Sequence, residues 1–238
     1  MSRKSEIEPT GPAGAATSPA EAFAREVARL PPRPAAGGRG RLLFAMDATA
    51  SREPTWDAAT TQQGEMFVAA HEVGGLDVRL AFYRGFDEFK VSRWTSDGRE
   101  LARLMGAVRC LAGRTQVARL LRYAADQKRE SRLDAVVFVG DCCEEDVDEV
   151  GHEAGKLGLL GLPVFVFQEG HDKTASRLFP QIARLTRGAY CRFDRTSPGE
   201  LKRLLGAVAA YAAGGKAALV KYGRQQGGAA ALLTSQVD

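Results

Sequence analysis

Three oxygen-bearing side chains follow an apolar run early in the chain. In the segment RLLFAMDATAS, residues 41–51, Asp47, Thr49 and Ser51 stand at alternate positions directly after the apolar residues. Alternate residues of an extended segment point the same way, so these side chains can converge on one point. A carboxylate and two hydroxyls, without histidine or thiolate among them, suit Mg²⁺, Mn²⁺ or Ca²⁺ rather than zinc.

A second aspartate ends another apolar run. The segment LDAVVFVGD closes on Asp141, as the first run closes on Asp47. In an open α/β sheet, ligands bind beyond the carboxyl ends of the strands. Two carboxylates brought together there repel each other, and a cation removes that repulsion. The two runs therefore predict a divalent metal site at the carboxyl edge of a sheet.

The elements that would position these side chains alternate between strand and helix. Hydrophobic periodicity predicts strands at residues 41–47, 76–85, 86–94, 133–141, 162–168 and 189–193. It predicts helices at residues 54–73, 97–109, 115–130, 145–159, 174–187 and 198–213. The two strands around Gly85 look like a hairpin, which implies one antiparallel edge strand. The fold class predicted is α/β, a doubly wound, Rossmann-like, mostly parallel six-stranded sheet with helices on both faces.

Length and composition indicate one globular domain with tails. The 238 residues suffice for a domain of about 170–200 residues. We predict a mobile leader rich in Pro, Ala and Gly over residues 1–40, a domain over 41–213 and a loosely ordered tail over 214–238. No apolar run approaches the roughly 20 residues that a membrane span needs, and the amino terminus lacks the apolar core of a secretory signal.

The four cysteines, Cys110, Cys142, Cys143 and Cys191, form no CxxC pair and show no regular spacing. A zinc site or a disulfide framework would require such a pattern. A reducing, cytoplasmic setting is therefore expected.

Together these residues resemble the von Willebrand factor A domain family and its metal-ion-dependent adhesion site. The family signature is D-x-S-x-S after the first strand, a threonine in a later loop and an aspartate after the fourth strand. Here DATAS supplies Asp47, Thr49 and Ser51, LAGRTQVARLL supplies Thr115, and VVFVGDCCEE supplies Asp141. The family's strand order, 3-2-1-4-5-6, would place the two aspartates on neighbouring strands. The chain departs from the family at Thr49, where serine is usual, and in GDC, where many members have SDG.

The resemblance implies adhesion rather than catalysis. In the family a divalent metal, expected here to be Mg²⁺, keeps one coordination position open for a partner's Glu or Asp. Residues on the flanking loops, Arg52, Arg114, Cys142 and Glu144, are expected to form the rim that touches the partner. Bacterial relatives act beside ATP-driven, chaperone-like machines, so an AAA+-type ATPase is an expected partner by resemblance alone.

Two other functions remain open on the sequence. Residues 99–132 hold nine Lys/Arg against three acids, so an RNA- or DNA-binding module that uses these Arg-rich helices is one alternative. A metal-dependent phosphoester hydrolase is the other, although DATAS lacks the second acid of the D-x-D motif of haloacid-type phosphatases. Strand-end Asp and Thr residues also serve as helix caps or turn formers, which is the structural explanation for the same pattern.

Overall fold

The computed structural model describes residues 39–54, 76–193 and 206–212, together with 26, 214–215, 217–218 and 222. The predicted leader and the predicted helix at 54–73 lie almost entirely outside these residues. The predicted last helix is described in part, and residues 206–212 are helical. Most of the predicted tail lies outside the described residues, so these domain boundaries stay predictions.

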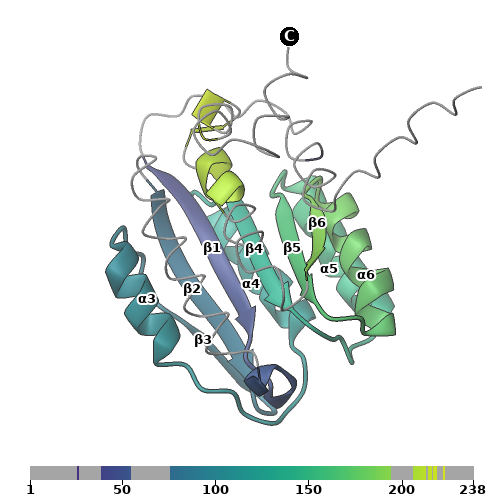
Figure 1. The fold of residues 1–238 in the computed structure, drawn as a ribbon. Coiled ribbons are helices and arrows are strands. Elements are labelled where there is room, and N and C mark those ends of the chain that lie inside the picture. The colour runs from purple at the N-terminus through teal and green to yellow at the C-terminus, as the bar shows by residue number, and fades with distance from the viewer. Residues whose placement is uncertain are drawn as a thin grey trace, which may run out of the picture.

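A six-stranded sheet forms the centre of the described structure (Figure 1). Its strands are β1 (Gly40–Asp47), β2 (Leu76–Arg84), β3 (Glu88–Val91), β4 (Ala135–Gly140), β5 (Val164–Glu169) and β6 (Tyr190–Phe193). They lie in the order β3-β2-β1-β4-β5-β6. Only the pairing of β2 with β3 is antiparallel, and every other neighbouring pair is parallel. The predicted fold class, including its antiparallel edge strand, is confirmed.

Helices cover both faces of this sheet. The described helices are α3 (Gly98–Gly106), α4 (Val117–Glu130), α5 (Val147–Leu159) and α6 (Lys173–Leu185), with a short 3₁₀ turn, η1 (Ala50–Arg52). Aspartates cap three of the helices, because the side chains of Asp97, Asp146 and Asp172 accept hydrogen bonds from first-turn backbone N–H groups. None of the described helices has the length and apolarity that crossing a membrane requires.

The alternation of side chains along β1 divides the core into two layers. Leu42, Phe44 and Met46 pack with α3 and residues 206–212, whereas Leu43 and Ala45 pack with α4, α5 and α6. A strand that is apolar at every position is therefore buried on both faces, as parallel sheets require.

The strand register brings the polar strand ends to one edge. Asp47 pairs with Tyr83 of β2, and Met46 pairs with Val139 of β4, two residues before Asp141. The carboxyl ends of β1, β2 and β4 therefore meet, with η1 directly after β1 (Figure 1).

Candidate metal site at the carboxyl edge of the sheet

Asp47 is the buried centre of this edge, with 0% of its surface exposed. Its Oδ1 accepts a hydrogen bond of 2.7 Å from the backbone N–H of Thr49, and its Oδ2 accepts one of 3.1 Å from the Tyr83 hydroxyl. Burial raises the pKa of Asp47 to about 6, the hydrogen bonds from Thr49 oppose that rise, and repulsion from Asp141 adds to it. A neighbouring positive charge would therefore stabilise the ionised carboxylate of Asp47.

The two hydroxyl residues after Asp47 lie side by side. Thr49 Oγ1 and Ser51 Oγ are 3.0 Å apart and share a hydrogen bond. Ser51 Oγ also lies 4.0 Å from the sulfur of Cys142, which comes from the loop after β4. The loops that follow β1 and β4 are thus in contact, as the resemblance predicted for their parent strands.

Asp141 completes a cluster of ionisable ligands. One ligand atom each from Asp47, Asp141 and Cys142 lies within 4.8 Å of the others. The Oδ1 atom of Asp141 is buried and has no hydrogen-bond partner in the described structure. A buried acceptor without a donor is costly, and a cation would supply the missing partner. The residues present therefore fit a divalent metal.

Thr115 reaches the same loop from the other side. Its side chain is buried, and its Oγ1 accepts a hydrogen bond of 3.0 Å from the backbone N–H of Glu144. The structure thus joins Thr115 to the segment that carries Asp141, while Ser51 approaches that segment through Cys142.

Glu145 anchors the loop after β4 to the start of α4. Its carboxylate accepts hydrogen bonds from the backbone N–H groups of Val117 and Ala118. These are first-turn donors that lack a partner within their own helix, and a negative charge there complements the helix dipole. The capping bonds hold the loop against the turn that contains Thr115.

Replacing Glu145 with Ala should lower the free energy of unfolding by about 0.5–2 kcal/mol, the range for loss of a helix cap. Urea denaturation measures this change, and hydrogen exchange should show faster exchange at the amides of Val117 and Ala118. Glu144→Ala is the matched control, because the Glu144 side chain is exposed and only its backbone N–H is used. Equal effects of the two substitutions would contradict the anchoring role.

The predicted rim residues occupy different environments. Arg114 and Glu144 are exposed and Cys142 is partly exposed, as a rim requires. The prediction for Arg52 is wrong, because its side chain is buried, with 0% of the side chain exposed. Its guanidinium donates to Glu169 Oε2 at 3.1 and 3.3 Å and to the backbone carbonyl of Asp47 at 3.0 Å. Arg52 therefore supports the site from beneath and cannot touch a partner.

Two exposed apolar side chains, Phe86 and Leu111, flank the loop after β1. They are 78% and 50% exposed. The Leu111 backbone N–H donates to the carbonyl of Ala48, and the Gly85 N–H donates to the carbonyl of Leu111. The apolar contribution to a rim thus comes from the β2–β3 turn and the segment before Thr115, which sequence analysis did not identify.

Gly113 allows this segment to lie against the end of β2. A Cβ atom at Gly113 would lie 1.8 Å from the carbonyl oxygen of Gly85, so the backbone would have to move. We expect Gly113→Ala to cost about 1–3 kcal/mol and to displace Thr115. Gly151→Ala is the control, because a Cβ there meets nothing within 4 Å and helix propensity favours Ala by up to about 1 kcal/mol. If thermal or urea unfolding shows equal stability for the two variants, the requirement for glycine at position 113 is contradicted.

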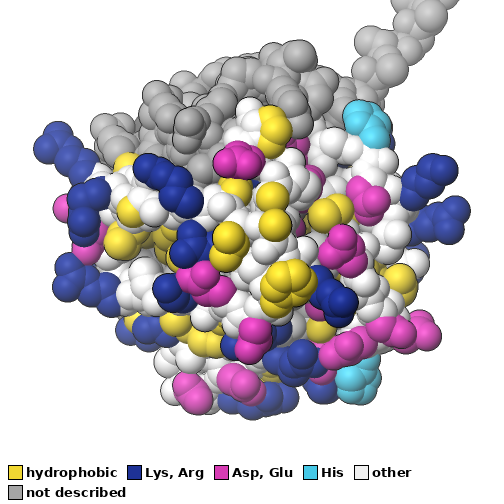
Figure 2. Space-filling model, turned by 90° about the horizontal axis from the view of Figure 1, so that it is seen from below, with side chains coloured by type: hydrophobic (Ala, Val, Ile, Leu, Met, Phe, Trp, Pro, Cys, Tyr) yellow, Lys and Arg dark blue, Asp and Glu magenta, His cyan; other side chains and the backbone are white. Residues whose placement is uncertain are grey.

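The charge on this edge is mixed rather than basic. Figure 2 looks onto the carboxyl edge and shows hydrophobic, basic and acidic side chains interspersed. Within the Arg-rich segment, several arginines form ion pairs with acids, namely Arg119 with Asp87, Arg122 with Glu149, Arg129 with Asp126 and Arg132 with Asp134. Such pairing reduces the unbalanced positive charge on which nucleic-acid binding depends.

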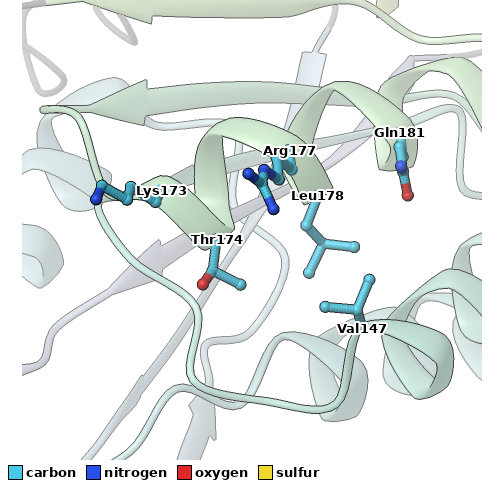
Figure 3. Close-up of a pocket in the computed structure, with 6 residues that line it drawn as sticks. All are labelled: Val147, Lys173, Thr174, Arg177, Leu178 and Gln181. Carbon is cyan, nitrogen blue, oxygen red and sulfur yellow. The ribbon is translucent and has the colours of Figure 1, made fainter.

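A groove of about 340 Å³ lies between the start of α5 and one side of α6. Figure 3 shows Val147 and Leu178 facing each other across it, with Lys173, Thr174, Arg177 and Gln181 along α6. None of these residues belongs to the cluster around Asp47. The groove is therefore a separate feature of the same molecule.

Tyr83, Glu145 and Glu169 are the contributors to the site that sequence analysis missed. Tyr83 could have been found, because it lies near the carboxyl end of the strand that the predicted order places beside β1. Burial raises the pKa of Tyr83, which keeps its hydroxyl protonated as a donor to Asp47. Glu145 and Glu169 carry no signal in the local sequence, because their partners lie 27–28 and 117 residues away.

No family model and no curated protein sequence matches the chain. Solved structures do match its fold. A von Willebrand factor type A protein from Catenulispora acidiphila superposes with a TM-score of 0.60 at 15% identity, over 74% of this chain and 43% of that one. The pilus adhesin SpaC from Lactobacillus rhamnosus GG superposes with a TM-score of 0.59 at 10% identity, over 76% of this chain and 30% of that one. The human COPII-coat protein Sec24c superposes with a TM-score of 0.55 at 9% identity, over 74% of this chain and 32% of that one. The chain thus spans less than half of each of these structures, and what it shares with them is the von Willebrand factor A fold.

Proposed function

We propose that this protein is a non-enzymatic interaction module that binds an acidic residue of a partner protein through a divalent metal. Asp47, Thr49, Ser51, Thr115 and Asp141 would hold the metal. The single observation that carries the proposal is the buried Oδ1 of Asp141, which has no hydrogen-bond partner and belongs to the same cluster as the buried Asp47. The five oxygen donors by themselves favour Mg²⁺, with Mn²⁺ or Ca²⁺ as the other hard cations.

The chain's own residues prepare such a site. Tyr83 and the Thr49 N–H orient both oxygens of Asp47, and the Glu144 N–H orients the hydroxyl of Thr115. A bound cation would offset the repulsion between the two aspartates and accept a carboxylate from the partner. Fixing the donors in advance lowers the entropic cost of binding.

The surroundings suit a partner that is acidic and partly apolar. Phe86 and Leu111 are exposed beside the loop after β1, and Arg114 is exposed two residues before Gln116 of the α4 cap. An apolar side chain next to the partner's Glu or Asp would bury surface against Phe86 and Leu111.

The similar structures support an interaction role. One is named as a pilus adhesin, another as a pilus component, the PilB minor pilin from Streptococcus sanguinis, and a third as a coat protein. By the resemblance of its sequence motifs to the von Willebrand factor A family, we also propose an adaptor role beside an AAA+-type ATPase in the cytoplasm. The four cysteines are free thiols, which is consistent with that compartment.

Calorimetric titration of Mg²⁺ and Mn²⁺ tests the metal site. We expect the purified protein to bind, and both Asp47→Ala and Thr115→Ala to weaken binding. Asp148→Ala is the control, because Asp148 is an exposed acid of the first turn of α5 outside the cluster. Binding of either ion that is equal in all four proteins would overturn the metal site.

Pull-down with and without chelator then tests the interaction. A partner that is retained with Mg²⁺, released by chelator and absent from the Asp47→Ala eluate would support metal-bridged binding. If the partner is retained in the presence of chelator and by the Asp47→Ala variant, metal-bridged binding is contradicted.

A further inference from the structure

We infer that the Cys142 thiol is a ligand of this metal, so that the site prefers Zn²⁺ or Co²⁺ to Mg²⁺. The inference rests on the proposed metal site and changes the ion expected there. Cys142 directly follows Asp141, and its sulfur belongs to the same cluster as the carboxylates of Asp47 and Asp141. The five oxygen donors predicted from the sequence omit this sulfur.

The separations in the cluster are close to those around one shared cation. Metal–oxygen bonds of about 2.1 Å and metal–sulfur bonds of about 2.3 Å put ligands on opposite sides of an ion about 4.4 Å apart, and neighbouring ligands closer. The three ligand atoms lie within 4.8 Å of one another, so small adjustments of side chains would place all of them around one ion. The Oδ1 of Asp141 is buried and has no hydrogen-bond partner among the described residues.

A sulfur ligand changes which cation the site favours. Thiolate is a soft donor that binds Zn²⁺ and Co²⁺ and contributes little to binding Mg²⁺. When the metal–sulfur bond forms, the thiol proton leaves to solvent. Arg52, buried beneath Asp47, lowers the charge cost of gathering three acidic groups, because its positive charge acts on Asp47.

The other cysteines do not offer the same contact. Cys143 is 4% exposed and packs in the core layer that α4, α5 and α6 form with the sheet. Cys110 is partly buried and close enough for the charges of Asp47 and Asp141 to act on it, but it is not a member of the cluster. Cys110 therefore provides a matched control for the thiol of Cys142.

Co²⁺ titration of the reduced full-length protein tests the inference directly. A bond between thiolate and Co²⁺ produces a charge-transfer absorption band in the near ultraviolet, which oxygen ligands do not produce. We expect this band in the wild type and in Cys110→Ser, and its loss in Cys142→Ser. The Zn²⁺ affinity of Cys142→Ser should fall at least about tenfold, because even residues outside the ligand shell typically cost 10–100-fold. Its Mg²⁺ affinity should change little.

The outcomes separate this inference from the proposed function. Binding of Co²⁺ and Mg²⁺ that needs Asp47 but gives no charge-transfer band would overturn the role of Cys142 and leave the metal site intact. A band that survives in Cys142→Ser and disappears in Cys110→Ser would overturn it in favour of Cys110. No binding of any of these cations by the folded wild type would overturn both proposals. Circular dichroism of each variant verifies that it is folded.

Discussion

Asp47→Asn is expected to abolish metal binding and to stabilise the metal-free protein at pH 7. The asparagine keeps the shape of the side chain, can accept from the Thr49 N–H and can donate to the Tyr83 hydroxyl, which also accepts hydrogen bonds. It removes the buried negative charge and its repulsion with Asp141. Metal affinity should fall by at least about 10–100-fold, since residues outside the ligand shell already have effects of this size.

The expected gain in stability follows from the pKa of Asp47. Burial raises that pKa from 3.8 to about 6 in the folded protein, so the folded state holds a proton that the unfolded state has released. The contribution of the protonated carboxyl to stability is full below about pH 4 and is lost as the pH rises to about 6. A difference of this size corresponds to about 3 kcal/mol at pH 7, at 1.36 kcal/mol per unit.

Urea denaturation in the presence of chelator, at several pH values between 4 and 7.5, measures this effect. The stability of the wild type relative to Asp47→Asn should decline across the window and then level off. Asp148→Asn is the control, because it removes an exposed acid outside the cluster. If the free energies of unfolding of the wild type and Asp47→Asn differ by the same amount at every pH, the raised pKa of the buried carboxyl is contradicted. Unchanged metal affinity would contradict the role of Asp47 as a ligand.

Removal of one partner from the Arg52–Glu169 pair should cost about 3–5 kcal/mol. Both side chains are buried, with 0% and 7% of the side chain exposed, and the ion pair is 3.1 Å long. Glu169→Ala leaves a buried guanidinium without this carboxylate, and Arg52→Met leaves the carboxylate without the guanidinium. The double variant, in which neither charge remains, should recover much of the loss because the buried charge is gone.

A double-mutant cycle with chemical denaturation measures the coupling between Arg52 and Glu169. The surface pair of Arg129 and Asp126 is the control, because its side chains are 54% and 63% exposed and such pairs contribute about 0–1 kcal/mol. If Glu169→Ala lowers the free energy of unfolding no more than Asp126→Ala does, the buried pair does not support the structure. Because Arg52 also bonds the Asp47 carbonyl, Glu169→Ala should weaken metal binding without removing a ligand.

The chain's local patterns determined the fold and the place of the site. Runs such as LLFAM are apolar at every position, so they must be buried on both faces, and helical periodicity between the runs supplies the covering layers. A strand buries alternate side chains, and a helix buries every third or fourth one. Both spacings can be read within a short stretch of sequence, which is why these elements were predictable. Asp47 and Asp141 stand at the ends of two such runs, so their position at the carboxyl edge followed from the same windows.

Contacts between distant segments were decided only by the tertiary structure. Arg52 stands in a polar loop and looked exposed. The end of β5 brings Glu169 to it from 117 residues away, and that partner makes its burial favourable. Glu145 looks like part of an acidic helix start, but it caps α4 because the loops before α4 and α5 meet at one edge. Cys142 lies beside Ser51 because the loops after β1 and β4 meet at the same edge. Such pairings depend on how loops cross between strands, and periodicity within a segment carries no information about that crossing.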